Sequence, residues 1–213
     1  MTLCNHCSAN LNFLIYVSNM YKNRYIYDGE PILFPYFPLN NNAILPMDTF
    51  KNEVSLHWES YIQSVQNTIA LDESPTTLDL NFINNPNDYN YQSLFKKNKE
   101  GIEAFNQVLK SFMGWWNSFY SGYRVIDYIS GKFIPEIGTN IDNKLLKKHN
   151  RLPNYNLFLI AVYDKVPFNL KNAGRNFIIE PISHLDLTYQ DENRRSNSIG
   201  CLVDKLTQHL IYE

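Results

Sequence analysis

The first residues of the chain include side chains that are able to bind a metal ion. Cys4 and Cys7 have the C-x-x-C spacing of thiolate pairs that hold zinc, and His6 lies between them. A structural zinc site needs four ligands, but no second C-x-x-C or C-x-x-H motif follows. Because chain ends fray, we expect residues 1–9 to be loose and to bind no metal.

A second group of residues carries carboxylates and a lysine. Glu136, Asp142 and Lys144 resemble the acid…(Asp/Glu)-x-Lys pattern of the restriction-endonuclease family, which implies a metal-dependent nuclease. The pattern departs from that family because the two acids are close together in a polar stretch, not in an apolar strand. Asp164 and Glu180 each follow an apolar run and offer another carboxylate pair, but no lysine follows Glu180 closely.

Other catalytic motifs are missing from the sequence. The chain contains no phosphate-binding glycine loop, no G-x-S-x-G nucleophile motif and no H-E-x-x-H zinc motif. His209 lies two helical turns after Cys201, which is too far for the hydrogen bond that a cysteine nucleophile makes with its base. We therefore interpret Cys201 as a small apolar core residue. These observations favour a protein without catalytic residues or cofactors, and an enzyme remains the alternative.

Charge is distributed unevenly along the chain. Residues 1–95 carry 3 Lys or Arg against 9 Asp or Glu, whereas residues 96–151 carry 10 against 5. Such asymmetry marks a partner-binding surface or two faces that attract each other within one fold. For the first alternative, the predicted partner-binding residues are Asp72, Glu73, Asp79 and Asp88.

The basic segment contains one regular pattern. Lys144, Lys147, Lys148 and Arg151 follow the i, i+3, i+4, i+7 spacing, which places them on one face of a helix. This face is a candidate for binding anions, although such faces are usually only solvated. Trp115 and Trp116 could stack on bases, but helical spacing in an apolar segment favours a core role. We therefore expect no nucleic-acid partner.

Hydrophobic periodicity predicts both strands and helices. The predicted strands are neighbouring core strands at 157–163 and 177–179, a half-buried strand at 77–82 and a hairpin at 25–34 with its turn at Asp28-Gly29. The predicted helices cover 50–71, 99–120, 124–129 and a segment from 198, with 99–120 as the central helix and Phe105, Leu109, Phe112 and Trp116 nearly inaccessible.

These elements are grouped along the chain and do not alternate strictly, which is typical of the α+β class. We predict a single compact domain over residues 1–213, with an antiparallel or mixed sheet packed against several helices. No run of 18 apolar residues exists, so we expect a cytoplasmic protein without a membrane partner. The favoured function is non-enzymatic binding of another protein, as by a bacterial immunity protein or antitoxin that neutralises a basic nuclease toxin. The alternative is a metal-dependent nuclease or another enzyme acting on nucleic acid.

Overall fold

The computed structural model describes residues 1–25, 31–38, 40–152 and 156–208, and these residues form a four-stranded mixed sheet with helices around it. The strands are β1 (Thr2–Cys7), β2 (Asn156–Val162), β3 (Ala173–Gly174) and β4 (Phe177–Pro181), in the spatial order β1-β2-β4-β3. The α-helices are α1 (Ala9–Lys22), α2 (Met47–Ala70), α3 (Thr76–Asn84), α4 (Lys99–Trp116), α5 (Gly122–Gly131), α6 (Ile134–His149), α7 (Ile182–Leu185) and α8 (Glu192–Gln208). Short 3-10 helices cover η1 (Asn23–Tyr25), η2 (Pro86–Tyr89), η3 (Tyr91–Leu94) and η4 (Pro167–Asn169). The α+β class and the single compact domain are confirmed.

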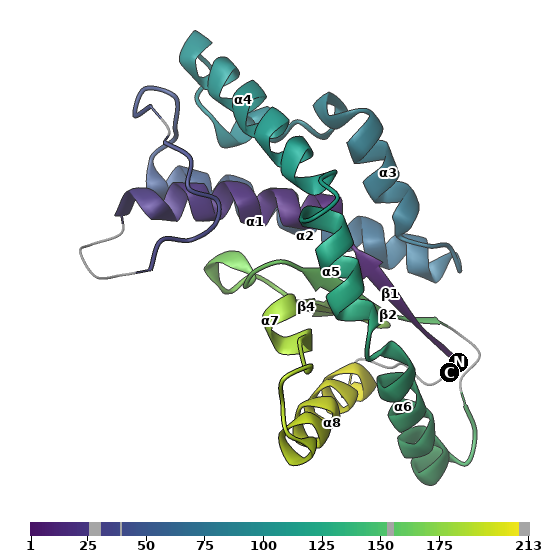
Figure 1. Ribbon diagram of the computed structural model, residues 1–213. Helices are drawn as coiled ribbons and strands as arrows, with labels where there is room; N and C mark the ends of the chain where they lie inside the picture. The colour runs from purple at the N-terminus through teal and green to yellow at the C-terminus, as the bar shows by residue number, and fades with distance from the viewer. Residues whose placement is uncertain (26–30, 39, 153–155, 209–213) are drawn as a thin grey trace.

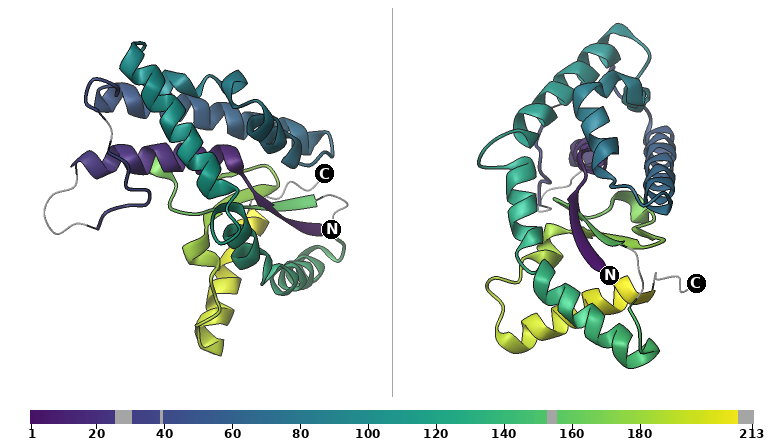
Figure 2. Two further views of the ribbon diagram at one scale, coloured as in Figure 1. Left: turned by 45° about the horizontal axis from the view of Figure 1, so that its top comes forward. Right: turned by 90° about the vertical axis from the view of Figure 1, so that its right-hand side faces the viewer.

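Helices cover both faces of this sheet. In Figure 1, α1 to α4 lie above the sheet and α6, α7 and α8 lie below it, while α5 runs beside β1 between the two groups. The two views in Figure 2 show the same arrangement. None of the described helices is both long and apolar enough to cross a bilayer.

The two predicted core strands are neighbours in the sheet, as expected. β2 and β4 run parallel, with Phe158 opposite Phe177 and Ile160 opposite Ile179. Parallel strands are usually covered on both faces and therefore read as continuous apolar runs. This explains why β2 was visible in the sequence.

The expectation that residues 1–9 are loose is wrong. Residues 2–7 form β1, which pairs in parallel with β2, with Leu3 opposite Leu157 and Cys7 opposite Ala161. The physical reason is that both partners hydrogen-bond along their whole length, which fixes the N-terminal segment at the edge of the sheet. Its mixed polar sequence hides this role, because only one face of β1 packs against α5 and α6.

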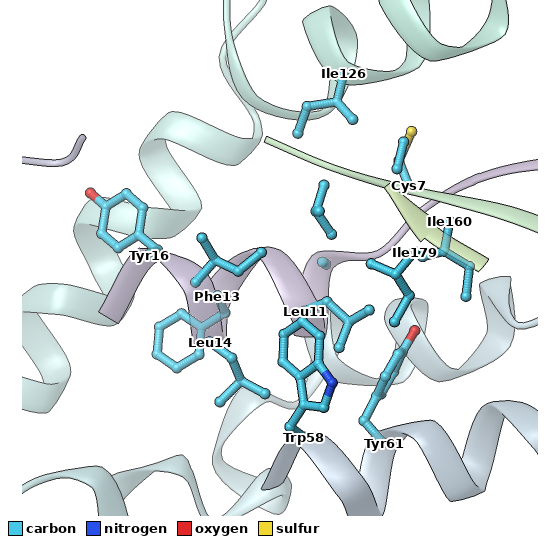
Figure 3. Packing of buried hydrophobic residues seen from close by; sticks show 14 of the residues in the cluster. Cys7, Leu11, Phe13, Leu14, Tyr16, Trp58, Tyr61, Ile126, Ile160 and Ile179 are labelled. Atoms are coloured by element: carbon cyan, nitrogen blue, oxygen red, sulfur yellow. The ribbon is translucent and has the colours of Figure 1, made fainter. Parts of the chain in front are cut away.

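The helix at the centre of the molecule is α1, not the predicted segment 99–120. Every residue of α1 except Lys22 is buried. Figure 3 shows its side chains Leu11, Phe13 and Leu14 among Trp58 of α2 and the residues of the sheet. Within α4, Phe105, Phe112 and Trp116 are buried as expected, but Leu109 is only half-buried and residues 117–120 lie beyond the end of the helix.

The remaining predictions of secondary structure agree with the structure only in part. The predicted strand at 77–82 is wrong, because these residues belong to helix α3, which buries Asp79 and Phe82 at the helical i, i+3 spacing. The turn of the predicted hairpin, Asp28-Gly29, lies outside the described residues, and residues 31–38 form no strand. Helices α2, α5 and α8 correspond to predicted helical segments but begin two to six residues earlier than predicted, and α2 ends at Ala70, one residue before the predicted end.

Candidate functional site

The four predicted partner-binding acids do not share one environment. Asp72 and Glu73 lie in the exposed turn after α2, and Asp88 is exposed on η2. Asp79, by contrast, is only 4% exposed, so its inclusion in an acidic surface was wrong. The reason is that Asp79 belongs to a helix whose buried face turns this carboxylate toward the sheet and α1.

The Asp79 carboxylate lies within hydrogen-bond distance of five donor groups. Its Oδ1 accepts hydrogen bonds from the backbone N–H and the Nδ2 of Asn10, both at 2.8 Å, and the Ser8 hydroxyl lies at 3.1 Å. Its Oδ2 lies 2.7 Å from Nε2 of His6 and accepts a hydrogen bond from the Tyr61 hydroxyl, also at 2.7 Å. The donors come from the end of β1, the first turn of α1 and the middle of α2. Asp79 thus joins three elements to α3, and the N-terminus of α1 favours its negative charge.

Two tyrosines hold this hydrogen-bond network in one arrangement. Burial, and secondly the charge of Asp79, raise the pKa of Tyr61 well above its usual value, so its hydroxyl keeps the proton that it donates. The Tyr91 hydroxyl donates to Oδ1 of Asn10 at 2.8 Å, which leaves Nδ2 of the same amide directed at Asp79. Buried polar networks whose members are satisfied hold their side chains rigidly.

A cavity of about 440 Å³ lies beside this network. Its walls are the carboxyl end of β1, helix α3, the end of α4 and the start of α5; Figure 1 shows α3 and α5 on the two sides of the end of β1. The lining residues include the polar side chains Asn5, His6, Thr76, Asp79, Asn117, Arg124 and Asp127 and the apolar or aromatic side chains Leu80, Ile83, Trp116 and Tyr123. Both the volume and the mixture of an apolar wall with a few polar groups are typical of small-ligand sites.

His6 links the cavity to the buried network. Its side chain is 6% exposed and lines the cavity, and Nε2 is held by Asp79. In the described part of the chain, Nδ1 makes no hydrogen bond. When Nε2 carries the proton toward the carboxylate, Nδ1 is left as a proton acceptor. A histidine oriented by a carboxylate in this way is suited to general acid–base chemistry.

The neighbouring cysteine is not suited to nucleophilic chemistry. Burial, followed by the charge of Asp127, raises the pKa of Cys7 to about 12, so its thiol remains protonated at neutral pH. Its Sγ lies 3.9 Å from both Asp127 and Ser130 of α5. Cys4 stands three residues before Cys7 on the strand, which places the two thiols on opposite faces of β1. The C-x-x-C pair therefore cannot converge on one metal ion without a change of β1.

The start of α5 contributes two charged groups to the cavity. Asp127 accepts a hydrogen bond from Nδ2 of Asn5 at 3.2 Å. Arg124 is exposed, and its guanidinium carbon lies 5.7 Å from the ring centre of Phe119, but it forms no hydrogen bond or ion pair with a described residue. The cavity lining therefore includes an exposed cation that no described carboxylate neutralises.

The residues of the predicted nuclease pattern do not converge. Glu136 pairs with Arg195 at 3.4 Å, and Lys144 pairs with Asp204 at 2.5 Å, both between α6 and α8. Asp142 lies elsewhere on α6, and its Oδ1 is buried and has no hydrogen-bond partner among the residues that the structure describes. This segment is a helix that packs against α8, and its described acidic residues do not form a metal-binding group.

The alternative carboxylate pair is separated as well. Asp164 accepts a hydrogen bond from Asn19 at 2.7 Å. Glu180 is buried and lies 2.8 Å from His184 and 2.6 Å from Lys205. The two acids thus hold different partners, and the described residues contain no group of three His, Cys, Asp or Glu placed to bind a metal ion.

The predicted basic face is only partly present. Lys144 is engaged by Asp204 and by Thr207, whereas Lys147 and Lys148 are exposed. Helix α6 ends at His149, so Arg151 lies beyond it and does not extend the helical face. Cys201, which we expected in the core, is exposed on α8, and His209 lies outside the described residues.

Sequence reasoning missed the pair of His6 and Asp79 because the two residues are 73 positions apart and no local pattern joins them. Comparison with known proteins finds no matching family model, no matching curated protein and no matching solved structure.

Proposed function

We propose that this chain binds a small molecule in the cavity between β1, α3 and α5 and that His6 carries out acid–base chemistry on it. The observation that supports this proposal is the buried pair of His6 and Asp79 on the wall of a cavity of about 440 Å³. Perturbed or paired titratable groups in a cleft are a common property of catalytic sites.

A purely structural role for Asp79 accounts for part of this arrangement. Asp79 accepts hydrogen bonds at the first turn of α1, which stabilises a helix with or without a histidine nearby. It does not account for a histidine that lines a cavity with one ring nitrogen held by a carboxylate. That geometry has the properties of a base whose orientation is fixed before the ligand arrives.

The proposed chemistry follows from these contacts. His6 takes a proton from water or from a ligand group through Nδ1, and Asp79 stabilises the imidazolium that forms. Ser8 and Tyr61 hold Asp79 in turn, so they position the acid–base residue and do not touch the ligand. Because Cys7 stays protonated, the site favours direct proton transfer or attack by an activated water molecule over a covalent thiol intermediate.

The test is a turnover assay with purified protein on a panel of small esters, phosphate monoesters, glycosides and N-ribosides. We expect turnover of at least one class, with a loss of about 100-fold or more in His6→Gln, as is typical for removal of a general base. The matched control is His57→Gln, since His57 is half-buried and, like His6, hydrogen-bonded, at 2.7 Å to Ser93, but does not line this cavity. Absence of turnover on the whole panel, or equal turnover in His6→Gln, would contradict the proposal.

A second candidate function is the binding of a basic protein, which is the original immunity or antitoxin hypothesis for a cytoplasmic bacterial protein. The observation in its favour is that Asp72, Glu73 and Asp88 are exposed and form no ion pair with a described residue. The competing explanation is that these acids attract the basic segment within the fold. It is weakened because Lys144 of that segment pairs with Asp204. Unpaired like charges on a surface contribute little to folding but steer a basic partner toward it.

This second candidate is tested with a variant that neutralises Asp72, Glu73 and Asp88 but keeps the buried Asp79. We expect the melting temperature to be unchanged. Partner capture from a lysate of the source organism should weaken, and the difference should shrink as salt screens the charges. An earlier melting temperature together with unchanged capture would contradict the hypothesis.

A further inference from the structure

Aromatic and apolar side chains line the cavity from helices on either side of the end of β1. One wall carries Trp116 from the end of α4 and Tyr123 from α5, whose ring centres lie 5.8 Å apart. The other wall carries Leu80 and Ile83 from α3. Tyr123 is 43% exposed and Leu80 is 51% exposed, so both have apolar surface that a ligand is able to cover. An aromatic ring packed against such surfaces gains both area burial and stacking.

Polar side chains of the cavity lining match the edge of a heterocycle or the hydroxyls of a sugar. Asn5 lines the cavity and donates from Nδ2 to Asp127 at 3.2 Å. Asn117 and Asp127 also line the cavity and add an amide and a carboxylate. A few polar groups beside apolar walls are what orients a ligand in sites of this kind.

One cation in the cavity lining is placed to meet an anionic group of a ligand. Arg124 is the one Lys or Arg among the described lining residues, and it forms no ion pair there. Arginine binds phosphate through two parallel N–H donors. The charge of Asp79 is already met by its own donors, and Asp127 would repel a second phosphate.

From this combination of exposed aromatic and apolar surface, polar side chains and one exposed arginine, we infer that the ligand of the cavity is a nucleoside monophosphate. The base would lie between Tyr123 and Leu80, and the phosphate would bind Arg124. The inference names the ligand class of the proposed acid–base site and therefore rests on the same cavity.

The experiment is titration calorimetry of the full chain with AMP and UMP, with adenosine, with ribose 5-phosphate and with ATP. We expect at least one monophosphate to bind more tightly than its parts and more tightly than ATP. Arg124→Gln should weaken monophosphate binding by about 10-fold, because a charge-assisted contact is lost, but leave adenosine binding unchanged. Tyr123→Ala should weaken both by about 5-fold or more, because both lose a stacking contact. Arg194→Gln, a change of another exposed arginine on α8, is the control and should bind like the wild type.

Three results would overturn the inference. They are no heat or competition with either monophosphate at millimolar concentration, ribose 5-phosphate binding as tightly as the monophosphates, or unchanged affinity in Arg124→Gln. Failure here is distinguishable from failure of the proposed function. If the protein turns over another substrate class in a His6-dependent way but binds no nucleotide, only the nucleoside monophosphate as ligand is contradicted. If the protein binds a nucleotide but shows no turnover, the nucleoside monophosphate is supported as the ligand and only the proposed acid–base role of His6 is contradicted.

Discussion

Replacing Asp79 by alanine is the perturbation that the structure predicts most firmly. The substitution removes the acceptor for Asn10, His6, Ser8 and Tyr61, all of which lie in buried or nearly buried positions. Each buried donor that loses its partner costs about 1–3 kcal/mol.

These costs do not add fully. The Ser8 hydroxyl also lies 2.9 Å from the Tyr61 hydroxyl and keeps that contact, and water from the neighbouring cavity is able to reach His6. We therefore expect Asp79→Ala to lower the free energy of unfolding by about 3–5 kcal/mol, a large share of the roughly 5–15 kcal/mol that a domain usually has. Asp79→Asn should lose less, because one amide oxygen still accepts from Asn10.

The assay is urea unfolding followed by tryptophan fluorescence, with Asp88→Ala as the matched control. Asp88 is exposed, so its replacement should change the free energy of unfolding by no more than about 0.5 kcal/mol. A loss below about 1 kcal/mol for Asp79→Ala would refute the reasoning, since five contacts to one buried carboxylate would then carry almost no stability.

Three further predictions concern packing and the thiols. Phe112→Ala should lower the free energy of unfolding by about 3–5 kcal/mol, because Phe112 is fully buried, and Phe119→Ala, at a 70% exposed position, should be nearly neutral in the same urea assay. The pKa of Cys7 is raised from 9.0 to about 12, so between these values the unfolded chain loses a proton that the folded chain keeps, and stability falls as pH rises. Unfolding curves from pH 8 to 11 should show this alkaline loss reduced in Cys7→Ala, by up to about 1.4 kcal/mol per pH unit; parallel pH profiles would contradict it. A thiol reagent added to the native protein should label the exposed Cys201 rapidly and leave Cys7 unmodified until unfolding; mass spectrometry showing Cys7 labelled first would contradict the burial.

The elements that the sequence predicts well are those whose hydrophobic pattern reflects their own surroundings. Strand β2 is buried on both faces and reads as a continuous apolar run, and α2 buries one stripe that includes Val54, Trp58 and Val65. In both cases local pattern and tertiary packing agree, so periodicity was sufficient.

Helix α1 and strand β1 could not be predicted in this way. Four buried positions of α1 are polar, and three of them, Asn10, Asn12 and Asn19, make specific side-chain hydrogen bonds. Asn12, for example, donates to the carbonyl of Ser8 and accepts from the backbone N–H of Tyr163. These residues interrupt the apolar pattern of the most buried helix. β1 depends on pairing with β2, which lies far along the chain, so no local signal marks it.

The interpretation of 77–82 shows how a short pattern fits two periods. Leu78, Leu80 and Phe82 alternate as in a strand, yet Leu80 is exposed in the structure and Asp79 is buried with Phe82. What decides between the two is the set of hydrogen bonds that Asp79 makes to distant residues, which only the tertiary structure shows. The same error hid the site, because a surface carboxylate was expected where the partner of His6 stands.

We propose above all that chemistry takes place in the cavity beside His6. The most direct measurement is turnover of whichever panel substrate the wild type accepts, compared with Leu80→Trp and Leu71→Trp. Leu80 lines the cavity and Leu71 is exposed outside it, so only the first change fills the ligand space with a larger side chain. We predict that Leu80→Trp folds normally and loses turnover while Leu71→Trp keeps it; full turnover in Leu80→Trp would contradict the claim and place the active site elsewhere.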